Sequence, residues 1–336
     1  MKEQYQILKE ILEQEGSARF AASVQGEHAG MWMIWGNNGC ISRENGNVCE
    51  RWKKELQYVP GGMCTMVEGD RIFVQDYVPK PELVILGGGH ISKTLVSLGK
   101  MLGFRVILAD DRPEFASPER FPQADLVLCG GYEEVFGKIP CSAEGYYVVV
   151  TRGHQGDEMC VRQILKRPFR YVGMIGSRKK VAQTRKNLEQ EGISTVLLDA
   201  LHAPVGLSIG AITPEEIAVS IAAEVIQVKN ESHTEVMSAE VLNGLLQPQK
   251  KILVMIVEKH GSAPRGAGAC MVVGKEGRIA GSVGGGAVEY EACRHACRML
   301  KEQTDWDLRN YELNNIRSAE LGMICGGSNE LFFLAV

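Results

Sequence analysis

The clearest feature of the hydrophobic pattern is an uninterrupted apolar run at residues 83–86. It has no polar alternation, as expected of a parallel strand that is buried on both faces. Three glycines and a helix-forming segment follow, and a second apolar strand is expected at 105–109. The pattern therefore predicts a βαβ unit within residues 83–111.

The same alternation of short apolar runs and longer amphipathic segments continues along the chain. Further strands are expected at 125–129, 146–151 and 171–175, and further helices at 179–191 and 217–228. Thr213 is expected to cap the last of these helices, with Pro214 at its first position and Glu216 completing a capping box. Strands that alternate with helices predict a parallel sheet and a Rossmann-like α/β domain.

The segments on either side of this domain have a different pattern. Residues 17–78 are interpreted as short strands with turns, and a strand at 252–258 begins a last domain with one helix near 287–300. The predicted fold class is α/β, with a central Rossmann-like parallel sheet domain flanked by N- and C-terminal α+β segments. The expected divisions are an α+β region at 1–80, the Rossmann-like domain at 81–229, a linker at 230–250 and an α+β domain at 251–336.

Three short segments near the N-terminus resemble three segments near the C-terminus, in the same order. The pairs are 16–19 with 261–265, 33–41 with 271–279, and 70–73 with 329–332. One interpretation is that the N-terminal region is a degenerate copy of the last domain, with the same fold and packed against it. The alternative is convergence of hairpin turns, which favour Asn and Gly in any case.

The glycine turn after the first strand carries the strongest chemical signal. Gly87, Gly89 and Ser92 form a G-x-G-x-x-S variant of the dinucleotide-binding turn, in which Gly87 allows a sharp bend and Gly89 allows a ligand phosphate to approach. The helix N-terminus favours an anion. Asp110 and Asp111 end the second strand, where an acid binds ribose hydroxyls. The alternative is a βαβ unit whose glycines serve only packing.

Other polar residues follow the predicted strands at the same edge of the sheet. His90 lies inside the glycine turn and faces either a ligand or the protein. Arg152 and His154 follow the fourth strand, where they are candidates for anion binding or proton transfer, although Arg152 and Asp157 suit a structural ion pair equally well.

Two further loops complete the candidates in the central domain. Gly176, Ser177 and Arg178 follow the fifth strand and open a helix, which suggests a second small anion site. His202 lies in a later loop and is a candidate ligand contact.

The last domain has its own candidates. Ser262 and Arg265 supply a hydroxyl and a cation in one glycine-containing loop, and Gly284, Gly285 and Gly286 lead into a helix with Glu289 in its first turn. Cys325 precedes two glycines, so its thiol is either an accessible soft ligand or a buried structural group. We expect it near the 284–286 loop and the edge of the central sheet.

Composition narrows the class of protein. The 336 residues carry a net charge of −4, which argues against nucleic acid or an anionic membrane as the main partner. No apolar run approaches the roughly 20 residues of a membrane span, and the charged N-terminus lacks a signal-peptide core. The ten cysteines show no disulfide framework and no metal-ligand spacing. A cytoplasmic protein without a metal site is expected.

Several separate motifs together resemble one family, the XdhC/CoxI family of accessory proteins for molybdenum hydroxylases such as xanthine dehydrogenase. The motifs are LVILGGGHISKTL, DDRPEFASPERFPQAD, VGMIGSRKK, HAPVGLSIGAITPEEIAVSIAAE, GSAPRGAGACMVV, GRIAGSVGGGAVEYEA and LGMICGGSNELFF. The chain departs from the family pattern in three ways. The intact glycine-rich domain follows the Rossmann-like one, Ala287 stands where a Cys is common, and His154 is shifted.

The resemblance implies a function beyond nucleotide binding. It implies that the protein binds the molybdenum cofactor, as molybdopterin or its dinucleotide form, and delivers it after sulfur is added. The implied partners are a molybdenum hydroxylase and a sulfur donor such as a cysteine desulfurase, and a homodimer remains open. The alternatives are an NAD(P)-dependent oxidoreductase, for which no hydride-transfer residues are recognised, and a nucleotide-binding regulatory module.

Overall fold

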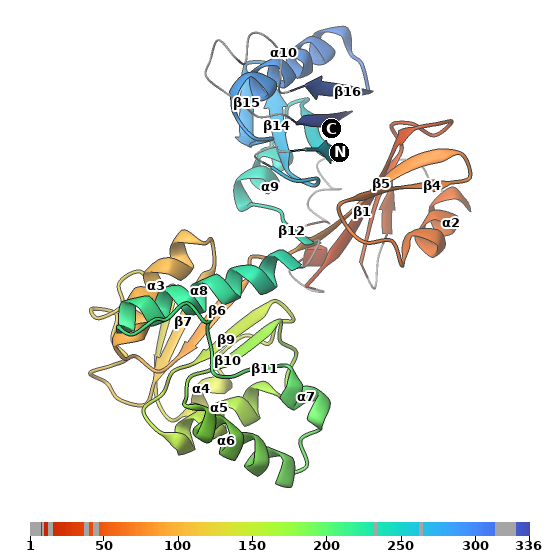
Figure 1. Cartoon of the computed structure of the whole chain (residues 1–336). Coiled ribbons are helices and arrows are strands. Elements are labelled where there is room, and N and C mark those ends of the chain that lie inside the picture. The colour runs from red at the N-terminus through yellow and green to blue at the C-terminus, as the bar shows by residue number, and fades with distance from the viewer. Residues whose placement is uncertain are drawn as a thin grey trace. The chain divides into compact units, whose positions relative to one another are not determined.

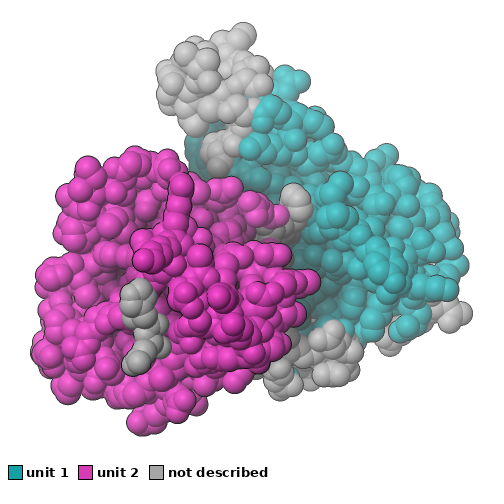
Figure 2. Space-filling view, turned by 60° about the horizontal axis from the view of Figure 1, so that its bottom comes forward, with its two compact units in different colours: residues 1–79, 233–336 teal, residues 80–232 magenta. Residues whose placement is uncertain are grey.

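The computed structural model divides the chain into two compact units, drawn in Figures 1 and 2. Unit 1 contains residues 1–79 and 233–336, and unit 2 contains residues 80–232. The structure describes residues 8, 10–12, 16–36, 40–42, 47–231, 234–261, 265–312 and 327–336, excluding the side chains of 41, 42, 47, 154, 155, 234–236 and 239. Among these residues, no helix is both long and apolar enough to cross a membrane.

Unit 2 is built on one parallel sheet with the strand order β11-β10-β9-β6-β7-β8. The strands are β6 (Glu82–Leu86), β7 (Arg105–Asp110), β8 (Leu126–Cys129), β9 (Gly145–Val149), β10 (Tyr171–Met174) and β11 (Leu201–His202). Numbered within the unit, this is the 3-2-1-4-5-6 order of a Rossmann fold. The prediction of a Rossmann-like domain is confirmed.

Helices cover both faces of this sheet (Figure 1). The helices α3 (His90–Met101) and α8 (Pro214–Glu231) lie side by side on one face and share an apolar core with it. On the other face lie α4 (Tyr132–Phe136), α5 (His154–Ile164), α6 (Arg178–Gln190) and α7 (Thr195–Asp199). Burial on both faces explains why the strands are continuous apolar runs.

The expected capping box at the start of α8 is confirmed. The hydroxyl of Thr213 accepts a hydrogen bond from the backbone N–H of Glu216 at 3.3 Å, and the N–H of Thr213 donates to Glu216 Oε2 at 3.0 Å. Two N–H groups that lack partners within the helix are thereby satisfied.

Replacing Thr213 by alanine is expected to lower the free energy of unfolding by about 1 kcal/mol, because the N-terminal cap is lost. Denaturant unfolding measures this change. Thr195→Ala, at an exposed helical position, is the control and is expected to change stability by less than about 0.5 kcal/mol. Equal losses in the two variants would contradict the assigned cap.

In the described part of the chain, unit 1 contains two sheets whose five antiparallel strands follow the same order, and the first sheet has a sixth strand that is parallel to its neighbour. The first runs β4-β5-β1-β2-β3, with β12 also paired to β5, and the second runs β16-β17-β13-β14-β15. The first consists of β1 (Ala18–Gln25), β2 (Trp32–Trp35), β3 (Cys40–Ser42), β4 (Met63–Val67), β5 (Asp70–Val78) and β12 (Thr234–Val236). The second consists of β13 (Ile252–His260), β14 (Cys270–Gly274), β15 (Gly277–Gly281), β16 (Trp306–Glu312) and β17 (Ser328–Ala335).

The two sheets pack face to face, and each has one helix on its outer face. Phe20 and Phe73 from the first sheet share a core with Met255 and Phe332 from the second, to which α9 (Ala239–Leu246) contributes. The outer faces are covered by α2 (Asn47–Leu56) and α10 (Gly286–Glu302). The matching order and the shared core agree with a repeated unit, whereas the origin of one segment as a copy of the other stays a prediction.

Candidate functional site

The three glycines after β6 have different surroundings. Gly87 has a φ of +113°, and a Cβ atom there would lie 2.4 Å from the carbonyl oxygen of Val150. A Cβ atom on Gly88 would lie 1.9 Å from the carbonyl oxygen of Phe115. Gly89 has a φ of −72° and no atom within 4 Å of such a Cβ. The first two glycines are therefore required by the protein itself, and only Gly89 borders open space.

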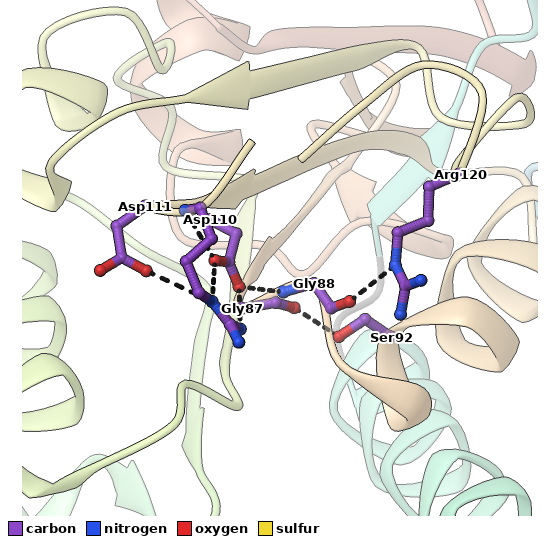
Figure 3. Close-up of polar contacts among 7 residues, drawn as sticks. Gly87, Gly88, Ser92, Asp110, Asp111 and Arg120 are labelled. Atoms are coloured by element: carbon purple, nitrogen blue, oxygen red, sulfur yellow. Dashed lines mark hydrogen bonds and ion pairs between the residues drawn. The ribbon is translucent and has the colours of Figure 1, made fainter. Parts of the chain in front are cut away.

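The start of α3 is suited to an anion. Gly89 is its N-cap and provides no side-chain cap, and the first turn has no acidic residue. His90 is the first helical residue and is exposed. Ser92 is completely buried, and its hydroxyl donates to the carbonyl oxygen of Gly87 at 2.5 Å, so it closes the turn from within (Figure 3).

Asp110 holds the glycine turn in place. Its Oδ2 accepts from the N–H of Gly88 at 2.7 Å and from Arg112 Nη2 at 2.9 Å, and its Oδ1 accepts from the N–H and Nε of Arg112 at 3.0 and 2.9 Å. A carboxylate has about four acceptor positions, and all of them are used here. Burial raises the pKa of Asp110, but the bonds from Arg112 and Gly88 outweigh it and hold the pKa below its usual value.

Asp111 is differently placed from its neighbour. Its side chain is 43% exposed, and its nearest ionic partner is Arg112 Nε at 3.7 Å. Figure 3 shows its carboxylate pointing away from Gly88. Of the two acids predicted to meet a ribose, Asp111 therefore has oxygens that are accessible to a ligand.

A buried ion pair lies behind the loop that follows β9. Asp157 is completely buried, accepts from the Thr151 hydroxyl at 2.6 Å and forms an ion pair with Lys180. Burial raises the pKa of Asp157, although the bonds from Lys180 and Thr151 oppose this. Arg152 is exposed and does not pair with Asp157, so that alternative is wrong. The side chain of His154 is outside the described residues.

The second predicted anion site is used for helix capping. Ser177 is the N-cap of α6, and its hydroxyl accepts from the N–H of Lys180 at 3.3 Å. Gly176 precedes it, and Arg178 is the first helical residue and is exposed. These residues stand where they were expected, and a ligand role for them stays a prediction.

His202 belongs to a network on the α8 face of the sheet. Its Nδ1 lies 3.3 Å from Glu224 Oε1, and Oε2 of Glu224 accepts from the Tyr171 hydroxyl at 2.5 Å and from the N–H of Gly206 at 2.9 Å. Burial raises the pKa of Glu224, but these bonds outweigh it and lower the pKa overall. The pairing of His202 with Glu224 was not recognised in the sequence.

The glycine triplet of the last domain is organised by an internal carboxylate. Gly284, Gly285 and Gly286 have positive φ values of 123°, 75° and 64°. Oε2 of Glu289 accepts from the N–H groups of Gly285 and Val283, both at 3.1 Å, and from the Ser282 hydroxyl at 2.6 Å. Glu289 therefore occupies N–H donors of this loop that would otherwise be available to a ligand.

A pocket of about 360 Å³ lies next to this triplet within unit 1. Its polar lining includes Arg265, Arg278, Cys270 and Ser282. Arg278 also forms an ion pair with Glu289 at 2.5 Å. Two predicted site residues, Ser262 and Cys325, lie outside the described residues. Within the described part of the chain, no group of His, Cys, Asp and Glu could hold a metal ion.

Two arginines support the glycine turn, a role that was not recognised in the sequence. Arg112 holds Asp110, and Arg120 donates from Nε to the carbonyl oxygen of Gly88 at 3.2 Å. Both guanidinium groups lie over the ring of Phe115, at 3.6 and 4.8 Å from its centroid. Both lie in the motif DDRPEFASPERFPQAD, which carried the family resemblance but gave neither arginine a role at the turn.

Two family models match the chain. The XdhC Rossmann domain matches residues 83–225, and the XdhC and CoxI family matches residues 245–312, which together make up more than half of the chain. The chain belongs to the XdhC/CoxI family. The resemblance seen in the sequence motifs is thereby confirmed.

This XdhC/CoxI chain is also similar to two curated relatives and to one solved structure. The uncharacterized protein YqeB of Escherichia coli K12 is 32% identical over 163 residues, covering 47% of the chain and 29% of YqeB. A probable xanthine dehydrogenase subunit from Bacillus subtilis 168 is 32% identical over 158 residues, covering 47% of the chain and 46% of that protein. The matched stretches therefore span less than half of either relative.

A crystal structure of a xanthine dehydrogenase from Bacillus halodurans shares the fold. The TM-score is 0.55 at 24% identity, and the match covers 67% of each chain.

Proposed function

We propose that this XdhC/CoxI protein is an accessory factor for a molybdenum hydroxylase of the xanthine dehydrogenase type, and that it binds the molybdenum cofactor. The family membership supports this proposal, as does the description of the Bacillus subtilis relative as part of a probable xanthine dehydrogenase. The proposed partners are the hydroxylase and a sulfur donor that modifies the cofactor before insertion.

The observation that carries the proposal is the open space at Gly89. This glycine follows β6 and is the N-cap of α3, with no side-chain cap and no atom within 4 Å of an added Cβ atom. The first N–H groups of α3 lack partners within the helix and are therefore candidate donors to a ligand in this space. The pterin cofactor carries a phosphate, or a pyrophosphate in its dinucleotide form, and either group suits such donors. The residues present therefore fit the phosphate end of the cofactor, whose bound metal would supply the oxidative chemistry of the client.

The proposal predicts that Gly89→Val abolishes cofactor retention while the protein stays folded. The Cβ atom of valine would meet no other residue, and the branched side chain would occupy the space next to the helix start, so the phosphate is excluded and the thermal midpoint changes little. The measurement is the fluorescence of the oxidised pterin released from protein purified from cells that make the cofactor. A folded variant that retains the wild-type amount of pterin would refute the assignment.

Gly131→Val is the matched control for this experiment. Gly131 is the N-cap of α4, also without a side-chain cap, and it also has no atom within 4 Å of an added Cβ. Because it follows β8 and is not part of the glycine turn, its replacement is expected to leave pterin retention unchanged.

An NAD(P)-dependent oxidoreductase is the second candidate function. The Rossmann strand order and the accessible carboxylate of Asp111 favour it. Mass spectrometry of small molecules bound to the purified protein distinguishes the two functions, because pterin supports cofactor delivery and NAD(P) supports the oxidoreductase.

A further inference from the structure

Arg120 has an arrangement that packing alone does not explain. It is partly buried and lies in the segment between β7 and β8, yet its Nε donates to the carbonyl oxygen of Gly88 in the glycine turn. Figure 3 shows Arg120 on the opposite side of Gly88 from Asp110. The rings of Phe115 and Phe121 lie 4.8 and 5.7 Å from its guanidinium carbon and fix its direction.

The charge of Arg120 is not balanced within the described part of the chain. No described carboxylate lies within ion-pair distance of Arg120, whereas the neighbouring Arg112 pairs with Asp110 at 2.9 Å. A partly buried guanidinium whose only hydrogen bond to the described residues is to a carbonyl oxygen favours a bound anion. Its two terminal nitrogens remain as donors toward such an anion, and a planar guanidinium suits two oxygens of one phosphate.

Asp110 is not available to bind the ribose of a nucleotide. The oxygens of Asp110 are saturated by Gly88 and Arg112, so this residue does not accept hydrogen bonds from ribose hydroxyls. The turn is therefore bordered by a neutralised Asp110–Arg112 pair on one side and by the unbalanced Arg120 on the other.

We propose that Arg120 is the phosphate-binding side chain of the glycine-turn site, and that Asp110 positions the turn without touching the ligand. This inference rests on the proposed binding of a phosphorylated cofactor at that turn and names the residue that selects for the phosphate. The phosphate belongs either to the pterin or to a nucleotide, and the two sources share the same recognition chemistry.

The test compares ligand pairs that differ only in phosphate. One pair is ADP and adenosine, and the other is the oxidised pterin of the cofactor before and after phosphatase treatment. Binding to the full-length protein is measured by calorimetry for the first pair and by fluorescence for the second. The variants are Arg120→Gln, Arg120→Lys and, as control, Arg105→Gln, whose arginine pairs with Glu82 at the opposite edge of the sheet.

Arg120→Gln is expected to weaken binding of the phosphorylated member of at least one pair about 10- to 100-fold and to leave its partner unchanged, because a charge-assisted hydrogen bond is lost. Arg120→Lys is expected to recover part of the affinity, and Arg105→Gln to change nothing. The pair that responds identifies the source of the phosphate.

Three results would overturn the assignment of Arg120. The first is that the wild-type protein shows no preference for the phosphorylated member of either pair. The second is that Arg120→Gln loses affinity equally for both members of a pair. The third is that folded Arg120→Gln binds the phosphorylated ligands with wild-type affinity. The thermal midpoint shows folding, and if Arg120→Gln does not fold, the comparison rests on Arg120→Lys. If the wild-type protein and Arg120→Gln retain equal amounts of pterin, only this inference is contradicted. If the wild-type protein itself retains no pterin, the proposed function is contradicted.

Discussion

Gly87→Ala is expected to lower the free energy of unfolding by about 3 kcal/mol or more. The φ of Gly87 is +113°, a conformation that disfavours a residue with a side chain, and the new Cβ would lie 2.4 Å from the carbonyl oxygen of Val150. Because that atom belongs to the backbone after β9, relief would require the two central strands of the sheet to shift. Denaturant unfolding of the full chain, monitored by circular dichroism, measures the loss.

Gly89→Ala is the matched control, two residues further along the same turn. Its φ of −72° is ordinary for alanine, and no atom lies within 4 Å of the added Cβ. A loss of no more than about 1 kcal/mol is expected, because alanine is a poorer N-cap residue than glycine. If the two alanine variants lose similar stability, the division of the turn into a structural and a ligand-facing glycine is wrong.

Lys180→Met is expected to destabilise the protein by about 3 kcal/mol at pH 8. Lys180 is the ionic partner of the completely buried Asp157, and removal of one partner leaves a buried charge uncompensated. The remaining bond to the carboxylate, from the Thr151 hydroxyl, replaces only part of that interaction. Unfolding in denaturant at constant pH measures the effect.

The loss in Lys180→Met is expected to shrink at lower pH. Burial raises the pKa of Asp157 in the folded protein above its unfolded value, so the folded state holds the extra proton and stability falls as the pH rises through this window. Without Lys180 the pKa of Asp157 in the folded protein rises further, so the pH range over which stability falls extends to higher pH. The deficit relative to the wild type is therefore larger at pH 8 than at pH 5.

The double variant Asp157→Asn, Lys180→Met separates lost charge pairing from lost packing. With no carboxylate to leave unpaired, it is expected to be more stable than Lys180→Met at pH 8 and to lack the pH dependence. A Lys180→Met deficit that is the same at pH 5 and pH 8 would show that the ion pair contributes little.

The local elements of this protein were predictable from the order of apolar and polar residues. The strands β6, β7 and β10 lie where short apolar runs were found, and the cap of α8 at Thr213 has the expected hydrogen bonds. These features depend on contacts between residues close in sequence or on burial of a whole strand, so a pattern along the chain is sufficient to indicate them. The family resemblance likewise followed from local motifs.

The sequence did not indicate which acidic side chains bind the protein's own groups and which are accessible to a ligand. Asp110 and Asp111 are identical neighbours in the sequence, but one is saturated by Gly88 and Arg112 while the other is accessible. Glu289 was a candidate site residue, and it accepts hydrogen bonds from N–H groups of its own glycine loop. Which donor reaches a carboxylate depends on the path of the backbone, which residue type and spacing do not specify.

Contacts between distant segments depended entirely on the folded chain. Arg120 reaches Gly88 across 32 residues, and the ionic partner of Asp157 comes from α6, 23 residues later. The two halves of unit 1 share one core although the whole of unit 2 separates them in the sequence. Hydrophobic periodicity determines which residues are buried and in which element, whereas the choice of partner is made when those elements pack, because packing brings together residues whose separation along the chain carries no signal.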